Sequence, residues 1–193
     1  MIPEELPLPI EVEDHLTWLS VERGRARNTV AAYRRDLRAY HSWLVSRHIN
    51  LDEVDDELIA TYIAELRALG RAPSSTARAL VAVRSLHRFL SEQGYRTSDP
   101  AADVEVPRVP KGLPKALSEG EVERLMDEVR GDDASARRDR VILEVLYGTG
   151  LRISELVGLS LSDVDLDGGL LRALGKGSRE RVVPLGRMAS GAL

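Results

Sequence analysis

A proline-rich stretch over residues 99–114 constrains the fold more than any other feature of the sequence. Proline removes a backbone donor and disfavours helical backbone at the residue before it, so the stretch can form neither a helix nor a central strand. Its prolines are Pro100, Pro107, Pro110 and Pro114. We therefore expect two domains, at residues 1–96 and 118–193, joined by a linker at 97–117.

Apolar residues at helical spacing predict four helices in the first domain. We expect the first over residues 9–22, the second from Asn28 as its N-cap, the third over 55–69, and the fourth from Pro73 to Gly94. The second helix carries a single apolar stripe at 3-4-3-4 spacing, made of Val30, Tyr33, Leu37, Tyr40 and Leu44.

The second domain mixes helices and strands. Ser118 and Glu121 form a capping box that opens a helix. The expected elements are helices over 118–129, 139–147 and 151–159, then strands over 170–174 and 181–185 that form a hairpin. Tyr147 lies in the apolar second helix, and we assign it to the core.

Charge alternates in sign along the first domain. Residues 21–48 carry seven arginines against two acids, a net +5, and residues 71–96 carry five arginines against one acid, a net +4. Residues 1–20 and 50–70 are each −5. Ordinary surface charge explains any one segment, but two basic segments separated by an acidic one are better explained by a basic face on the helical bundle.

Metal binding and nucleotide binding find no support. The chain has no cysteine, which excludes disulfides and thiolate metal sites and fits a reducing cytoplasm. A calcium-loop-like segment begins at Asp163 but has Leu174 where the loop needs a bidentate glutamate. A phosphate-binding loop around Lys176 lacks its first glycine and has Gly177 in place of Ser or Thr. No histidine has neighbours of a metal-ligand type; they are His15, His41, His48 and His87.

We also expect a cytoplasmic protein, because the sequence has no run of 18 apolar residues and its first residues do not read as a signal peptide.

Two basic residues of the second domain are candidate site residues, Arg152 and Lys176. Arg152 follows Gly148 and Gly150 near a helix start, where free backbone amides favour negative charge, and Glu155 lies one turn further on. Arginine with an acid at i+3 is more often a surface ion pair, and Lys176 at a hairpin tip is ordinarily solvated. Taken singly, each signal is weak.

Taken together with their surroundings, these residues resemble the tyrosine recombinase (phage integrase) family, and most of all its XerD branch. The resemblance covers nearly the whole chain. In the second domain it is carried by GTGLRISELVGL (148–159), SDVDLDGG (162–169) and GKGSRERVVPLG (175–186). In the first it is carried by NTVAAYRRDL (28–37), SSTARALVAVRSLHRFL (74–90) and the linker region 99–125.

The resemblance implies a mainly α fold: an N-terminal four-helix core-binding (SAM-like) domain and the start of an α+β catalytic domain with a β-hairpin. It implies site-specific DNA recombination through a 3′-phosphotyrosyl intermediate, with no metal or other cofactor. Arg152 would grip the scissile phosphate, Lys176 would protonate the leaving 5′ oxygen, and Glu155 would support the active-site geometry.

The resemblance also implies partners. The basic second and fourth helices would face a double-stranded DNA recombination site. The expected DNA contacts are Arg27, Arg34, Arg38, Ser74, Ser75, Thr76, Arg78, Arg84 and Arg88. A partner recombinase of the XerC type would complete a heterotetramer, a DNA translocase of the FtsK type would act with it, and the role would be resolution of chromosome dimers at division.

The sequence departs from the family after Lys176. Residues 177–193 contain no His-x-x-Arg, no histidine, no tryptophan and no tyrosine. We therefore expect this polypeptide alone to be inactive. Two alternatives stay open: a non-catalytic fragment that occupies recombination sites, and an integrase of a mobile element with the same chemistry.

Overall fold

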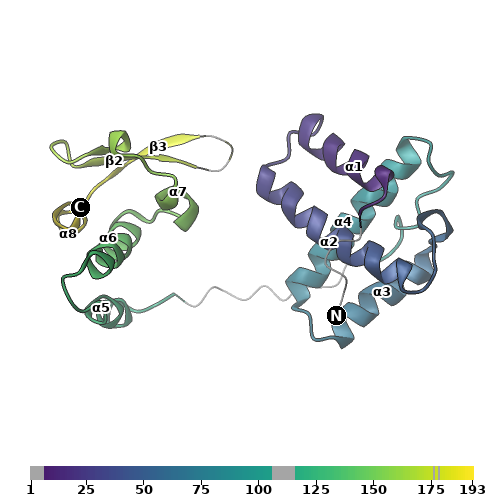
Figure 1. Ribbon diagram of the computed structural model, residues 1–193, viewed down its shortest axis with the longest axis horizontal. Coiled ribbons are helices and arrows are strands. Elements are labelled where there is room, and N and C mark those ends of the chain that lie inside the picture. The colour runs from purple at the N-terminus through teal and green to yellow at the C-terminus, as the bar shows by residue number, and fades with distance from the viewer. Residues whose placement is uncertain (1–6, 106–115, 176, 178) are drawn as a thin grey trace. The chain divides into compact units, whose positions relative to one another are not determined.

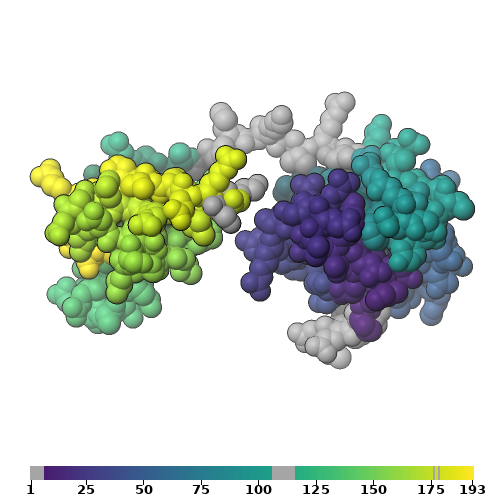
Figure 2. All heavy atoms as spheres, turned by 90° about the horizontal axis from the view of Figure 1, so that it is seen from above, coloured from purple at the N-terminus to yellow at the C-terminus, as the bar shows by residue number. Residues whose placement is uncertain are grey.

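The computed structural model describes residues 7–105, 116–175, 177 and 179–193. The chain divides into two compact units, Met1–Gly112 and Leu113–Leu193. In Figure 2 the purple to teal atoms of the first unit form one body, and the green and yellow atoms of the second form another.

The first unit is a bundle of four α-helices (Figure 1). They are α1 (Ile10–Val21), α2 (Arg27–Val45), α3 (Asp56–Ala68) and α4 (Pro73–Glu92), with a 3-10 turn, η1 (Leu51–Glu53), between α2 and α3. The predicted four-helix domain is confirmed. Its helices form where the apolar residues recur every three or four positions, because burying that stripe supplies most of a helix's stability in a protein.

The start of α2 corrects one expectation. The amides of Thr29 and Val30 donate to the carbonyl of Ala26, so the helix begins at Arg27 with Ala26 as its N-cap. Asn28 lies inside the first turn and does not cap the helix. A good capping residue was present, but the helical backbone starts before it.

The core of the first unit gathers one face of each helix. α2 contributes Leu37, Tyr40 and Leu44 from its predicted stripe, and all three are fully buried. Each fully buried side chain of this size contributes about 1.5–3 kcal/mol. Residues buried with them from the other helices include Leu16, Ile59, Leu80, Val83 and Leu86.

The second unit packs helices against a small antiparallel sheet. Its elements are α5 (Glu119–Asp127), α6 (Ala134–Thr149), α7 (Ile153–Val157), η2 (Leu161–Asp163), β1 (Val164–Asp165), β2 (Leu170–Leu174), β3 (Glu180–Pro184) and α8 (Arg187–Ala192). The strand order is β1-β2-β3, and Ala173 pairs with Arg181 in the β2–β3 hairpin. The capping box of Ser118 and Glu121 opens α5 as predicted.

The core of the second unit lies between the sheet and α6 and α8. Val145 of α6 and Ala189 of α8 pack with Leu171 and Ala173 of β2. α8 and β1 were not anticipated from the sequence. No helix among residues 7–105, 116–175, 177 and 179–193 is long and apolar enough to cross a membrane.

Two further expectations about α6 are wrong. The helix begins at Ala134, five residues before the expected start, because the Asp133 carboxylate accepts from the amide of Ala136 at 2.9 Å and caps it. Tyr147 is 57% exposed and does not belong to the core. The apolar run in the sequence predicted which residues lie on one face of α6. It did not predict which of those residues the neighbouring elements cover.

Candidate functional site

The turn between α6 and α7 places Arg152. Gly150 ends α6 in the left-handed conformation, with φ of +64°, which a side chain would disfavour. Leu151 then enters the core, and Arg152 becomes the N-cap of α7. The predicted helix after the two glycines is therefore present, but it begins at Ile153 instead of residue 151, with Arg152 as its N-cap.

Glu155 lies one helical turn after Arg152 and contacts it, as the i+3 spacing predicted. Its side chain is only 4% exposed. Oε2 accepts the backbone N–H of Arg152 at 2.8 Å, and Oε1 accepts Nη1 of the same residue at 2.9 Å. One carboxylate thus caps α7 and also holds the arginine that precedes it.

A second arginine completes the cluster. Arg181 of β3 donates from Nη1 to Oε1 of Glu155 at 2.7 Å and from Nη2 to Oε2 at 2.8 Å, a bidentate pair. The sequence prediction missed this residue. A signal was available: Arg181 alternates with Val183 and Leu185, so it lies on the inward side of its strand and needs an acidic partner.

The electrostatics keep the carboxylate ionised. The hydrogen bond from Arg181 and then the one from the Arg152 amide lower the pKa of Glu155 to about 2, against the opposing effect of desolvation. The same pair raises the pKa of Arg181 above its ordinary value. Two guanidinium groups face one carboxylate, so the cluster keeps a net positive charge.

Arg152 itself faces solvent. Its side chain is 66% exposed, and among the described residues Glu155 accepts from both its Nη1 and its backbone amide. The other guanidinium donors make no hydrogen bond to the described residues and can meet an anion. Planar guanidinium donors match two non-bridging phosphate oxygens.

Lys176 lies outside the described residues. The hairpin on either side of it is described: β2 ends at Leu174, and the amide of Gly175 donates to the carbonyl of Arg179 at 2.7 Å. A hollow of about 240 Å³ next to this hairpin is lined by Ser154, Glu155, Asp163, Arg172 and Glu180, with apolar residues between them.

The expected DNA contacts of the first unit fall into two groups. Four of them, on α2 and α4, are exposed and make no side-chain hydrogen bond or ion pair with other described residues: Arg27, Arg38, Ser74 and Arg88. The other five are buried, half-buried or bonded to other residues of the protein. That any of the nine residues contacts DNA stays a prediction.

Within the engaged group, each side chain has a definite position. Arg34 forms an ion pair with Glu13, and Arg78 donates to Asp36 at 2.8 Å. Arg84 donates to the carbonyl of Ala102 at 2.9 Å. Thr76 is buried and donates its hydroxyl to the Ala72 carbonyl, while Ser75 is half-buried.

Ser75 and Arg78 line a hollow of about 270 Å³ between α2, α3 and α4. Arg35 and Arg71 line it too, and neither was predicted from the sequence as a DNA contact.

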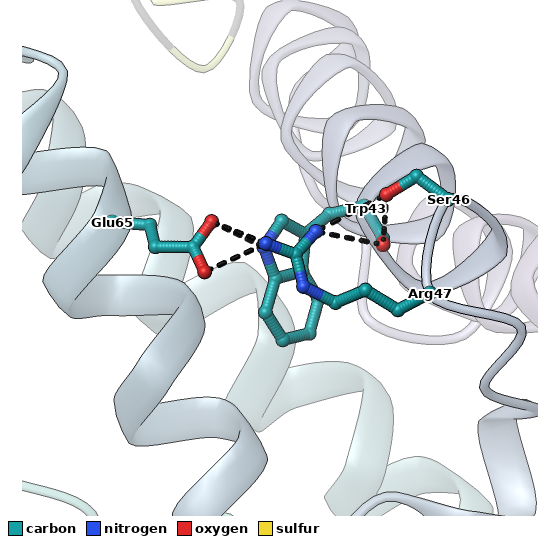
Figure 3. A network of polar contacts seen from close by, with 4 residues as sticks. All are labelled: Trp43, Ser46, Arg47 and Glu65. Atoms are coloured by element: carbon teal, nitrogen blue, oxygen red, sulfur yellow. Dashed lines mark hydrogen bonds and ion pairs between the residues drawn. The ribbon is translucent and has the colours of Figure 1, made fainter.

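Arg47, another arginine of the basic segment 21–48, makes contacts that stabilise the first unit. Figure 3 shows Arg47 beside the ring of Trp43, 4.3 Å from its centroid, and bonded to Glu65 of α3 at 2.7 Å. Trp43 Nε1 donates to the same carboxylate at 2.9 Å. This arginine therefore joins α2 to α3.

Comparison with known proteins decides the family. Residues 12–94 match the family described as phage integrase, N-terminal SAM-like domain, and residues 115–193 match the phage integrase family. The chain belongs to the phage integrase, or tyrosine recombinase, family.

Among its relatives are proteins named tyrosine recombinase XerD. The one from Halalkalibacterium halodurans is 42% identical over 184 residues, which are 94% of this chain and 62% of the relative. The one from Pseudomonas aeruginosa is 42% identical over 182 residues, 94% of this chain and 61% of the relative. This chain thus spans about three fifths of the length of the curated relatives it matches.

Solved structures share the fold. A lambda integrase tetramer bound to a Holliday junction has a TM-score of 0.71 at 18% identity, covering 94% of this chain and 52% of that one. The XerH recombinase bound to palindromic difH substrate, in a post-cleavage complex, has a TM-score of 0.67 at 17% identity, covering 94% and 55%. At this identity the likeness concerns the fold alone.

Proposed function

We propose that this chain binds a DNA recombination site and supplies the phosphate-gripping part of a tyrosine recombinase active site. The observation that carries the proposal is Arg152, an exposed guanidinium fixed at the start of α7 by the buried carboxylate of Glu155. Both residues lie within the segment that matches the phage integrase family.

The proposed chemistry is a phosphoryl transfer. A tyrosine oxygen attacks the scissile phosphorus, the bond from phosphorus to the 5′ oxygen breaks, and a 3′-phosphotyrosyl link forms. Arg152 would stabilise the charge that gathers on the non-bridging oxygens. Lys176 would give a proton to the departing 5′ oxygen. No step requires a metal or another cofactor.

For this 193-residue polypeptide alone, we propose site occupancy without cleavage. Residues 177–193 contain neither a tyrosine nor a His-x-x-Arg sequence. Nicked duplexes carrying the recombination sites of XerD relatives are expected to trap no covalent adduct with it. An adduct that survives SDS would contradict this prediction and would direct attention to the five tyrosines that the chain does contain.

The first unit would hold the duplex through α2 and α4. These two helices start without a side-chain cap and without an acid in the first turn, whereas Asp55 caps α3. The first residue of α4, Pro73, has no amide, so the amides free to meet phosphate oxygens are those of Arg27 and Asn28 in α2 and of Ser74 and Ser75 in α4. Arg38 and Arg88 would add charge along the same helices.

Salt dependence tests this DNA face. Each phosphate contact contributes about 0.9 to the slope of log affinity against log salt, so Arg38→Ala combined with Arg88→Ala should lower the slope by about 1.8 for a long duplex. Arg67→Ala, an exposed arginine of α3 in the same unit but outside the proposed face, is the matched control and should leave the slope unchanged. An unchanged slope in the double variant would refute the proposed face.

The biological role that we propose is Xer-type resolution of chromosome dimers, by a heterotetramer with a partner of the XerC type and with a translocase of the FtsK type. The XerD relatives support this choice. A mobile-element integrase with the same chemistry is the alternative. The genes next to the coding sequence would separate the two.

A further inference from the structure

We propose that Arg181 is a positioning residue for Arg152, acting through the carboxylate of Glu155. The proposal rests on the proposed function only in giving Arg152 its role at a phosphate. The geometry that carries it is a single carboxylate shared by two arginines from different elements, α7 and β3.

Each oxygen of Glu155 serves both arginines. Oε1 accepts from Nη1 of Arg181 at 2.7 Å and from Nη1 of Arg152 at 2.9 Å. Oε2 accepts from Nη2 of Arg181 at 2.8 Å and from the amide of Arg152 at 2.8 Å. The two donors of Arg181 therefore fix the plane of the carboxylate, and that plane fixes both bonds to Arg152.

Among the described residues, little else holds Arg152. The terminal torsion of a glutamate is broad, so a carboxylate without a second partner turns easily. α7 has only five residues, and the Arg152 side chain is 66% exposed, so it has few packing contacts. A lysine in place of Arg181 would keep the charge but not the planar pair of donors that holds both oxygens.

Gly175 provides the space for the ion pair. A Cβ at this position would lie 3.2 Å from Nη1 of Arg181, 3.2 Å from the Arg179 carbonyl and 3.4 Å from Oε1 of Glu155. The two 3.2 Å distances are tighter than ordinary van der Waals contacts, so with a methyl group here the Arg181 guanidinium or the Arg179 carbonyl would have to shift by a few tenths of an ångström. Gly175→Ala should therefore reproduce part of the effect of removing Arg181.

The test follows the guanidinium of Arg152 directly, by ¹⁵N NMR of the arginine side chains in the full 193-residue chain. Arg152→Lys assigns the signal. In the unaltered chain, the bond to Glu155 should slow rotation of the guanidinium and keep its Nη resonances separate. Arg181→Met should merge them, Arg181→Lys should not restore them, and Gly175→Ala should broaden them.

Arg172→Met is the matched control, because Arg172 is an exposed arginine on the neighbouring strand β2 and makes no hydrogen bond to Glu155. It should leave the Arg152 signal unchanged. A loss of fold would show in the backbone amide spectrum, and the milder Gly175→Ala variant then carries the test.

An Arg152 signal that is unchanged in Arg181→Met, or fully restored by lysine, would overturn the proposal. The measurement uses no DNA, so a failure of the proposed function would leave its result standing, and the reverse is also true.

Discussion

Acid should destabilise the first unit, because two histidines lie in its core as neutral rings. His15 Nε2 bonds to the Ser85 hydroxyl at 2.9 Å, while its Nδ1 is buried and has no hydrogen-bond partner in the part of the chain that the structure describes. His87 Nε2 bonds to the Tyr40 hydroxyl at 3.0 Å, and Arg96 lies at its other nitrogen. Burial lowers the pKa of His15 to about 4, and burial followed by the charge of Arg96 lowers that of His87 to about 3.

The sign and size of the effect follow from these values. Below pH 6.5 the two histidines become protonated in the unfolded chain but stay neutral in the folded core. The free energy of unfolding therefore falls as the pH falls toward their folded-state pKa values. Between pH 7.5 and 5.0 each histidine should cost about 2 kcal/mol, about 4 kcal/mol together. His41, whose pKa burial also lowers, acts in the same direction. A domain of this kind has about 5–15 kcal/mol in all, so the loss is large.

Urea unfolding at pH 7.5, 6.5, 5.5 and 5.0 would measure the effect. Both tryptophans of the chain, Trp18 and Trp43, lie in the first unit, so their fluorescence reports that unit alone. His15→Gln should remove about half of the pH dependence. His48→Asn is the control, since His48 is exposed and asparagine tolerates its positive φ of 58°. A loss below about 1 kcal/mol from pH 7.5 to 5.0 would refute the reasoning.

Two further predictions concern the core and the site. Tyr40→Phe should lower the free energy of unfolding by about 1–3 kcal/mol, because the buried Nε2 of His87 loses its partner; urea unfolding at pH 7.5 measures it, and an unchanged midpoint would contradict it. In a full-length tyrosine recombinase that contains residues 1–193 of this chain, Arg152→Ala should slow strand cleavage about 10²–10³-fold while site binding stays nearly intact. Adduct formation on a nicked site and gel-shift affinity, measured side by side, separate these two effects, and an equal loss in both would count against the assigned role.

Contacts between neighbours in the sequence could be predicted, but contacts between residues far apart in the sequence could not. The pairing of Arg152 with Glu155 was predictable because one helical turn joins them. Arg181 was not predicted because it lies 26 residues from Glu155, and only the register of the β2–β3 hairpin brings it there. Tyr147 was misassigned for a related reason: periodicity defines a stripe on a helix, but the neighbouring elements decide which part of the stripe is buried.

The charge pattern shows the same limit at the scale of a whole surface. The alternating charge of the segments predicted a basic face on the bundle. Some of these arginines instead form ion pairs with acids of the same bundle. Two arginines of segment 21–48 pair with acids of the two flanking acidic segments, Arg34 with Glu13 and Arg47 with Glu65. Exposed pairs of this kind contribute only about 0–1 kcal/mol each, yet they determine which cations stay available.

A count of charges therefore overstates the charge that DNA would meet. Arg78 is likewise held by Asp36, so three of the basic residues in the two segments bind acids of the same domain. If the paired arginines do not contact phosphate, the salt dependence of DNA binding should follow the unpaired cations instead. Arg34→Ala should then leave the slope nearly unchanged, although Arg34 contributes as much to the net charge of +5 as Arg38 does. Equal reductions of the slope by Arg34→Ala and Arg38→Ala would show that DNA breaks the Arg34–Glu13 pair, and that the sequence-based count was the better guide.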